Sequence, residues 1–355
     1  MTTDIRSQRF LFAMYPAQTH KEGRKNTMAE FEIASLAKDV DMYGLAYKTN
    51  RGMVLTAEES EARKDLDSYF KEVGRRGVDA NCEIAAFTQE VINEEIYNTP
   101  DELLDMMFDQ GDVGEFDDYE LYTEPKNTLI AYEAAPGGNV ERSFLDISLL
   151  KPTWKNRQIE TDVTLAELER NGWKTVSKIS EFAVSAFKNT MFSDLFSIID
   201  AAIATGAENC ITEGGATPTQ ASIDAAALYV QDRTDSGLFV ARSKYIQAIS
   251  KLTGFHSEEM LNELNKSGRL GKYDGIDLYP ISSAKKLGDG SHLIMDKRIF
   301  GIAGKIGRLN MKGAIKTYQD TDNNKEKIHL MFKNFTYGFA FNKDTLENVV
   351  KITLA

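Results

Sequence analysis

The four histidines are the residues of this 355-residue chain best suited to metal binding or acid–base catalysis. No two of them have the spacing of a zinc-ligand pair, and neither an H-E-x-x-H nor a C-x-x-C motif occurs. Ser257 follows a histidine directly, but adjacent residues seldom present the geometry of a nucleophile and its base. We therefore interpret the histidines as surface or structural groups: His20, His256, His292 and His329.

Two loops resemble ligand-binding motifs without completing them. The segment 301–307, GIAGKIG, lacks the four residues between glycines and the Ser or Thr after Lys that a phosphate-binding loop requires. The segment 320–324, DTDNN, begins like a calcium loop, but Lys325 takes the glycine position and Met331 the position of the bidentate Glu. We interpret them as a strand with its turn and as a polar hairpin tip. The sequence predicts no catalytic residue, no metal site and no cofactor.

The composition is that of a chain with an ordinary hydrophobic core. Hydrophobic residues make up 42% of it, which excludes an intrinsically disordered protein. No uncharged apolar run approaches the ~20 residues of a membrane-spanning helix. Two cysteines, Cys82 and Cys210, do not make a disulfide framework and fit a reducing compartment. We expect a soluble product that is made or assembled inside a cell.

Charge is distributed unevenly along the chain, whose 42 basic and 54 acidic residues give a net charge of −12. The acidic block, residues 90–124, holds 13 acidic residues and no Lys or Arg, whereas the basic block, residues 242–316, holds 14 basic and 7 acidic residues. Both blocks could be solvated faces. Alternatively, copies of the chain could meet acidic block to basic block, a contact that builds rings or lattices. A nucleic-acid site in the basic block is less favoured, because clustered Arg with interleaved aromatics is absent.

The first part of the chain is predicted to be an extended arm followed by helices. Residues 1–27 lack a regular period and need a partner to order them. Thr56 and Glu59 form a capping box for a helix that we expect to end before Gly74. Two further helices are predicted over about residues 82–97 and over residues 103–111. The first of them carries one apolar face: Ile84, Phe87, Val91 and Ile92.

A β-hairpin is predicted next. Residues 129–134 alternate as a strand, Pro136-Gly137-Gly138-Asn139 turns the chain, and residues 140–150 return. Proline sets one turn dihedral and the glycines accept positive φ, so the residue types suit a tight turn. Two isolated strands are marginal in water. The hairpin is therefore expected to need a neighbour.

The rest of the chain reads as a helical stretch, an α/β segment and terminal strands. A long helix is expected over residues 164–205, either continuous or broken, with Thr164 as its cap and a bend at Asn171-Gly172. Ser193 is expected to cap its last segment. The residues of its packing face have helical spacing: Trp173, Val176, Ile179, Ala183 and Phe187. Further elements are predicted as helices 219–232, 243–252 and 257–264, strands 238–241 and 276–279, strands after residue 293 with a turn at 320–324, and a last strand 349–354.

The order of these elements resembles the major capsid proteins of tailed bacteriophages, with their Hong Kong 97-type fold. Three pieces of sequence carry the resemblance: 127–144, with NTLIAY, APGG and SF; 275–303, with GIDLYPIS and the run from Gly290 to Ala303; and the helix–strand–helix stretch 221–251. The resemblance implies an α+β fold. Its implied parts are an N-terminal arm and helical region (1–111), an extended hairpin loop (112–155), a peripheral domain with a spine helix (156–210), an axial domain (211–290), and peripheral strands with the C-terminus (291–355).

The resemblance also implies a structural role and no enzymatic activity. It implies hexamers and pentamers that close into an icosahedral or prolate shell around double-stranded DNA, which is bound without sequence specificity. The implied partners are other copies of the chain, portal and scaffolding proteins and, as an option within the family, decoration proteins; no membrane is implied. The implied location is the virion, and the host cytoplasm during assembly. An encapsulin-like compartment or an uncharacterised cytosolic enzyme is the alternative. The hairpin would supply the contact to the neighbouring subunit through Leu129, Tyr132, Pro136, Gly137, Gly138, Val140 and Phe144.

Overall fold

A computed structural model describes a large part of the chain, in ten ranges. They are residues 40–76, 83–98, 101–115, 121–122, 149–150, 152–234, 237–252, 271–322, 325–341 and 346–355. The chain divides into two compact units, Met1–Asp41 and Met42–Ala355, and the elements below belong to the second. The predicted arm, residues 129–148 of the predicted hairpin and the predicted helix 257–264 lie outside the described residues.

Helices dominate the described part of the chain before residue 108: α2 Met42–Arg51, α3 Ala57–Arg76, α4 Glu83–Asn93, the π-helix η2 Glu94–Asn98 and α5 Glu102–Met107. The capping box is confirmed, because the Thr56 backbone N–H donates to Glu59 at 2.9 Å and the Glu59 N–H donates to the Thr56 hydroxyl at 3.2 Å. The expected end before Gly74 is wrong. A Cβ at Gly74 would lie 2.6 Å from the Glu169 backbone nitrogen, so this glycine allows close helix packing within α3 and does not stop it.

The predicted helix over residues 103–111 is wrong in its second half. The helix ends at Met107, and Phe108–Val113 forms strand β1, which pairs in parallel with β10, Gly307–Lys312. The Phe108 ring packs against Phe339 and Phe341, with ring centroids 5.7 Å apart in both pairs. Pairing with a strand far along the chain therefore overrides the local helical pattern.

A five-stranded sheet is built around the long strand β12, Lys327–Phe341. One edge of β12 pairs with β4, Thr153–Thr164, while the other pairs first with β11, Lys316–Asp322, and then with β10. The pairing of β12 with β4 shifts register at a bulge between Phe332 and Phe335. The turn predicted at residues 320–324 is wrong in its first part, because residues 320–322 still pair with β12 as the end of β11, and residues 323–324 lie outside the described residues. The buried aromatic side chains of β12 form the core of this sheet: Phe332, Phe335, Tyr337 and Phe339.

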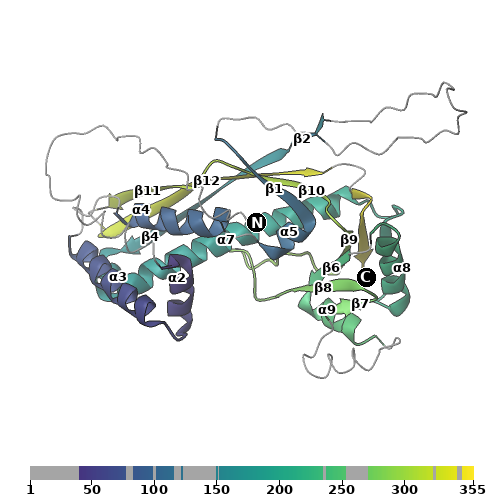
Figure 1. Ribbon diagram of the computed structural model, residues 1–355, viewed down its shortest axis with the longest axis horizontal. Helices are drawn as coiled ribbons and strands as arrows, with labels where there is room; N and C mark the ends of the chain where they lie inside the picture. The colour runs from purple at the N-terminus through teal and green to yellow at the C-terminus, as the bar shows by residue number, and fades with distance from the viewer. Residues whose placement is uncertain are drawn as a thin grey trace, which may run out of the picture. The chain divides into compact units, whose positions relative to one another are not determined.

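The expected spine consists of α6, Leu165–Asn171, and the 30-residue helix α7, Trp173–Ala202, joined at Gly172. The Thr164 hydroxyl accepts from the Glu167 N–H at 3.2 Å, which confirms the predicted cap. The predicted second cap at Ser193 is wrong, since α7 continues through it. Of the predicted packing face, Trp173, Val176, Ala183 and Phe187 are buried and Ile179 is half-buried. Figure 1 shows α7 between the five-stranded sheet and helices α2 and α3.

A six-stranded sheet has the order β5-β13-β9-β6-β8-β7. Its strands are β5 Cys210–Thr212, β6 Gly237–Arg242, β7 Lys272–Tyr273, β8 Ile276–Ile281, β9 Arg298–Ala303 and β13 Val349–Thr353. Helices α8, Gln220–Gln231, and α9, Ser243–Ser250, pack on it. The predicted helices and strands of residues 219–252 and the strand from residue 276 are thus confirmed to within a few residues. The segment 291–355 supplies strands to both sheets, because β9 and β13 join this one and β10–β12 join the other.

Candidate functional site

Helix α7 is hydrogen-bonded to the five-stranded sheet through Asp194. Its carboxylate accepts hydrogen bonds from Arg157 at 2.6 and 2.7 Å and from the hydroxyl of the buried Tyr337, and Lys155 lies 2.9 Å away. Burial alone would raise the pKa of Asp194, but the hydrogen bonds from Arg157, Tyr337 and Lys155 outweigh it and hold this pKa below its ordinary value. Asp194 therefore stays ionised and ties the spine to strands β4 and β12.

The ionised Asp194 and its three hydrogen-bond donors make the stability of the fold dependent on acid pH. Because the folded-state pKa of Asp194 lies below the unfolded value, its contribution to stability is full above about pH 5 and is lost as the pH falls through the folded-state pKa. We expect Asp194→Asn to lower the free energy of unfolding by about 2 kcal/mol near neutral pH. Urea unfolding at a series of pH values should show this difference shrinking below about pH 4. A difference that stays constant with pH would contradict the role of the charge.

The C-terminal end of α7 is bonded to the six-stranded sheet. The Lys351 side chain, which is 4% exposed, donates to the carbonyls of Asp200 at 2.9 Å and Ile203 at 2.5 Å. The Asp200 carboxylate lies 2.9 Å from Arg298 and 3.3 Å from Lys351. One helix is therefore held to both sheets through buried or half-buried charged groups.

The predicted hairpin is represented in the described residues by its base. Strands β2, Leu121–Tyr122, and β3, Leu149–Leu150, pair antiparallel and bring the two ends of the intervening segment together. This is the arrangement that a hairpin excursion requires. The seven residues expected to contact a neighbour, Leu129, Tyr132, Pro136, Gly137, Gly138, Val140 and Phe144, lie outside the described residues and stay a prediction.

The two charge blocks meet within one chain. Since β1 runs beside β10, Asp109 forms an ion pair with Lys305, and Glu115 pairs with Lys316 at 2.6 Å. Glu95 pairs with Lys188 of α7, also at 2.6 Å. Some carboxylates of the acidic block therefore form ion pairs with lysines of the basic block in the same subunit. The sequence predicted either two solvated faces or a contact between copies, and not this pairing. Glu102, Asp105 and Asp112 remain at the surface of α5 and β1.

The residues first considered for chemistry are dispersed. His329 lies 2.7 Å from Asp162 through its Nδ1, while His292 is distant in the other sheet region, and His20 and His256 lie outside the described residues. Within the described ranges, no group of three His, Cys, Asp or Glu side chains could hold a metal ion.

No helix in those ranges is long and apolar enough to cross a membrane. Residues 301–307 form the end of β9, a turn and the start of β10.

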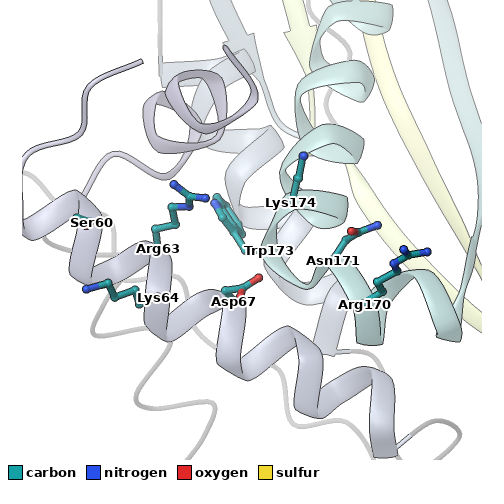
Figure 2. Close-up of a pocket in the computed structure, with 8 residues that line it drawn as sticks. All are labelled: Ser60, Arg63, Lys64, Asp67, Arg170, Asn171, Trp173 and Lys174. Atoms are coloured by element: carbon teal, nitrogen blue, oxygen red, sulfur yellow. The ribbon is translucent and has the colours of Figure 1, made fainter. Parts of the chain in front are cut away.

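A basic groove lies where α3 passes the junction of α6 and α7. It has a volume of about 460 Å³, and Figure 2 shows its lining residues: Ser60, Arg63, Lys64, Asp67, Arg170, Asn171, Trp173 and Lys174. Sequence reasoning missed this site, because its cations come from two segments far apart in the chain. The spacing 60, 63, 64 and 67, which places these residues on one face of a helix, is the signal that could have drawn attention to it.

Comparison with protein-family models and with curated proteins found no match. Among solved structures, the chain is similar to a chain in the capsid of an empty GTA particle, with 10% identity and a TM-score of 0.50 over 71% of this chain and 89% of that one. It also matches the capsid of cyanophage P-SCSP1u (8% identity, TM-score 0.48, 74% and 94% covered) and a chain of Microbacterium phage Oxtober96 (11%, 0.48, 70% and 89%). The likeness to the GTA capsid chain shows a shared fold, and the expected Hong Kong 97-type α+β fold is thereby confirmed.

Proposed function

We propose that this chain, which has the fold of a capsid subunit, is the major capsid protein of a tailed bacteriophage. In this proposal, hexamers and pentamers of the chain close into an icosahedral or prolate shell around double-stranded DNA. The fold shared with the GTA capsid chain is the observation that carries it. Portal, scaffolding and decoration proteins are the further partners, and the shell forms in the host cytoplasm and persists in the virion.

In this proposal each part of the fold corresponds to a part of a capsid subunit. The five-stranded sheet with α7 is the peripheral domain, the six-stranded sheet with α8 and α9 is the axial domain, and residues 112–155 are the extended loop that reaches a neighbouring subunit. The paired base of that loop, β2 with β3, supports this role. A contact between subunits would cover apolar side chains that one subunit leaves in water. Val54 is 94% and Phe182 65% exposed.

The overall charge supports an enclosing role. A net charge of −12 gives most of the shell wall the same sign as DNA, so the wall holds the packed genome without binding it tightly along its length. The DNA would then contact the wall tightly only at a few sites that carry local positive charge.

Electron microscopy of the recombinant chain, together with light scattering after size exclusion, tests the proposal. We expect rings, tubes or closed shells, because interlocking of extended loops makes the lattice the stable unit. A monodisperse monomer or dimer that persists across salt concentrations and with a scaffolding partner would overturn it. Shells that enclose a specific protein cargo and not DNA would assign the fold to a protein compartment.

A further inference from the structure

The basic groove concentrates positive charge that the described residues do not neutralise. Arg63 and Lys64 of α3, Arg170 at the end of α6 and Lys174 at the start of α7 line it. None of these four side chains has a hydrogen-bond or ion-pair partner among the described residues. The groove's one carboxylate, Asp67, lies 2.7 Å from Lys71 outside the lining. Four like charges around one hollow repel each other, and a bound anion would relieve that repulsion.

The buried wall of the groove offers an unused hydrogen-bond donor. Trp173 is 1% exposed, and its indole N–H has no acceptor among the described residues. An unpaired buried donor costs about 1–3 kcal/mol. Phe70 stacks on the indole at 6.2 Å between ring centroids, and Phe87 meets it edge-on at 5.6 Å. These contacts hold the ring in place, and Figure 2 shows it between Arg63 and Lys174 at the groove.

The N-terminus of α7 adds a third attraction for an anion. Helix α7 begins at Trp173 with Gly172 as its N-cap, so it has no capping side chain, and its first turn holds no acidic residue. Gly172 has φ +47°, and a Cβ there would lie 2.7 Å from the Asp67 carbonyl oxygen, so close contact with α3 excludes the usual capping residues. The positive end of a 30-residue helix, which has no side-chain cap, thus lies beside four cations.

We propose that this groove binds phosphate, and that in the assembled shell the phosphate belongs to the backbone of the enclosed DNA. The second part of this inference rests on the proposed function. The groove lies on a protein of opposite overall charge, so it would hold DNA at one point per subunit. Contacts to backbone phosphates carry no sequence information, which suits a container for any genome.

A carboxylate from the acidic block of a second copy is the competing ligand. It is less favoured, because Glu95, Asp109 and Glu115 already pair with cations of their own chain, which leaves the block fewer carboxylates for a second copy. The cations of the groove are also spread over three helices, α3, α6 and α7. This arrangement matches the repeated charges of a phosphodiester backbone better than it matches a single carboxylate.

Anisotropy titration of a fluorescein-labelled duplex of about 20 base pairs against the full-length chain tests the proposal. The groove variant is Arg63→Gln/Lys174→Gln, and the control is Lys251→Gln/Lys285→Gln, which removes two exposed cations of the six-stranded region. Both pairs are at the surface, so both variants should keep the wild-type unfolding midpoint. We expect the groove variant to bind about tenfold more weakly, and the slope of log K against log salt to fall by about 2. The control should behave as wild type.

Fluorescence gives an independent readout of the site. In a Trp154→Phe background, Trp173 is the only tryptophan of the chain, and its emission should change when the duplex or inorganic phosphate is added. A response to inorganic phosphate without one to duplex would overturn the assignment to DNA and leave a free-phosphate site. Equal salt slopes for groove variant and control, with unchanged emission, would overturn the site altogether.

The same variants separate this inference from the proposed function. If the groove variant binds duplex normally but no longer forms shells, the groove is a contact for the acidic block of another copy and the inference is wrong. If shells form normally and duplex binding does not depend on the groove, the proposed function stands and the inference fails. Shells that form normally together with weakened duplex binding are the expected result.

Discussion

Replacing Pro136-Gly137-Gly138 by three valines is expected to leave a folded, soluble subunit that no longer forms closed shells. Valine is β-branched and very rarely adopts the positive φ that glycine supplies in a tight turn. The pairing of β2 with β3 at the base of the segment would survive, because it lies away from the altered turn in sequence. Without the turn, the segment would not present its apolar residues to a neighbour. Electron microscopy and light scattering would follow assembly, and circular dichroism would follow folding.

The matched control places valine at Gly214 and Gly288. A Cβ at either position would have no atom within 4 Å, and neither glycine has a positive φ. This control variant should assemble like the wild type. Closed shells of normal size from the 136–138 variant would refute the role of the hairpin as the contact between subunits.

The second large effect is expected at the C-terminal end of α7. Lys351→Met should lower the free energy of unfolding by about 3 kcal/mol. Methionine fills a similar volume but donates no hydrogen bond, so the carbonyls of Asp200 and Ile203 lose their Lys351 donor. Asp200 would keep Arg298 as its ion-pair partner, so the loss comes mainly from the unpaired carbonyls. Urea unfolding of the unassembled chain measures the change.

Lys272→Met is the matched control. Lys272 lies in the same sheet and pairs with Asp277 at 3.1 Å, but its side chain is 64% exposed. Exposed ion pairs contribute about 0–1 kcal/mol, so this variant should be nearly as stable as the wild type. Equal losses in the two variants would show that burial of Lys351 has no special role.

Features set by neighbouring residues could be predicted from the sequence. The caps at Thr56 and Thr164 depend on partners three residues away, and both form as expected. The capping box of Thr219 with Ser222, at the start of α8, is equally local. Helical periodicity likewise located most of α4 and α7, because one helix face packs against the rest of the fold.

Features set by distant residues could not be predicted. The sequence of β1 has the apolar spacing of a helix. It forms a strand because it pairs with β10 and because Phe108 packs against Phe339. The basic groove requires Arg63 and Lys174 to meet across the packing of α3 on the α6–α7 junction. Because such contacts depend on the completed fold, they are absent from any short window of sequence.

The place of β13 in the six-stranded sheet has a consequence for synthesis on the ribosome. This strand lies between β5 and β9, although β5 is made long before it and has no other strand neighbour in the described sheet. Pairing over such a sequence separation is slow to form. A nascent chain that carries β5, α8 and β6 but not yet β13 therefore has an incomplete sheet. We expect chains still being translated to be excluded from a growing particle, because translation of β13 is what makes a subunit competent to join it.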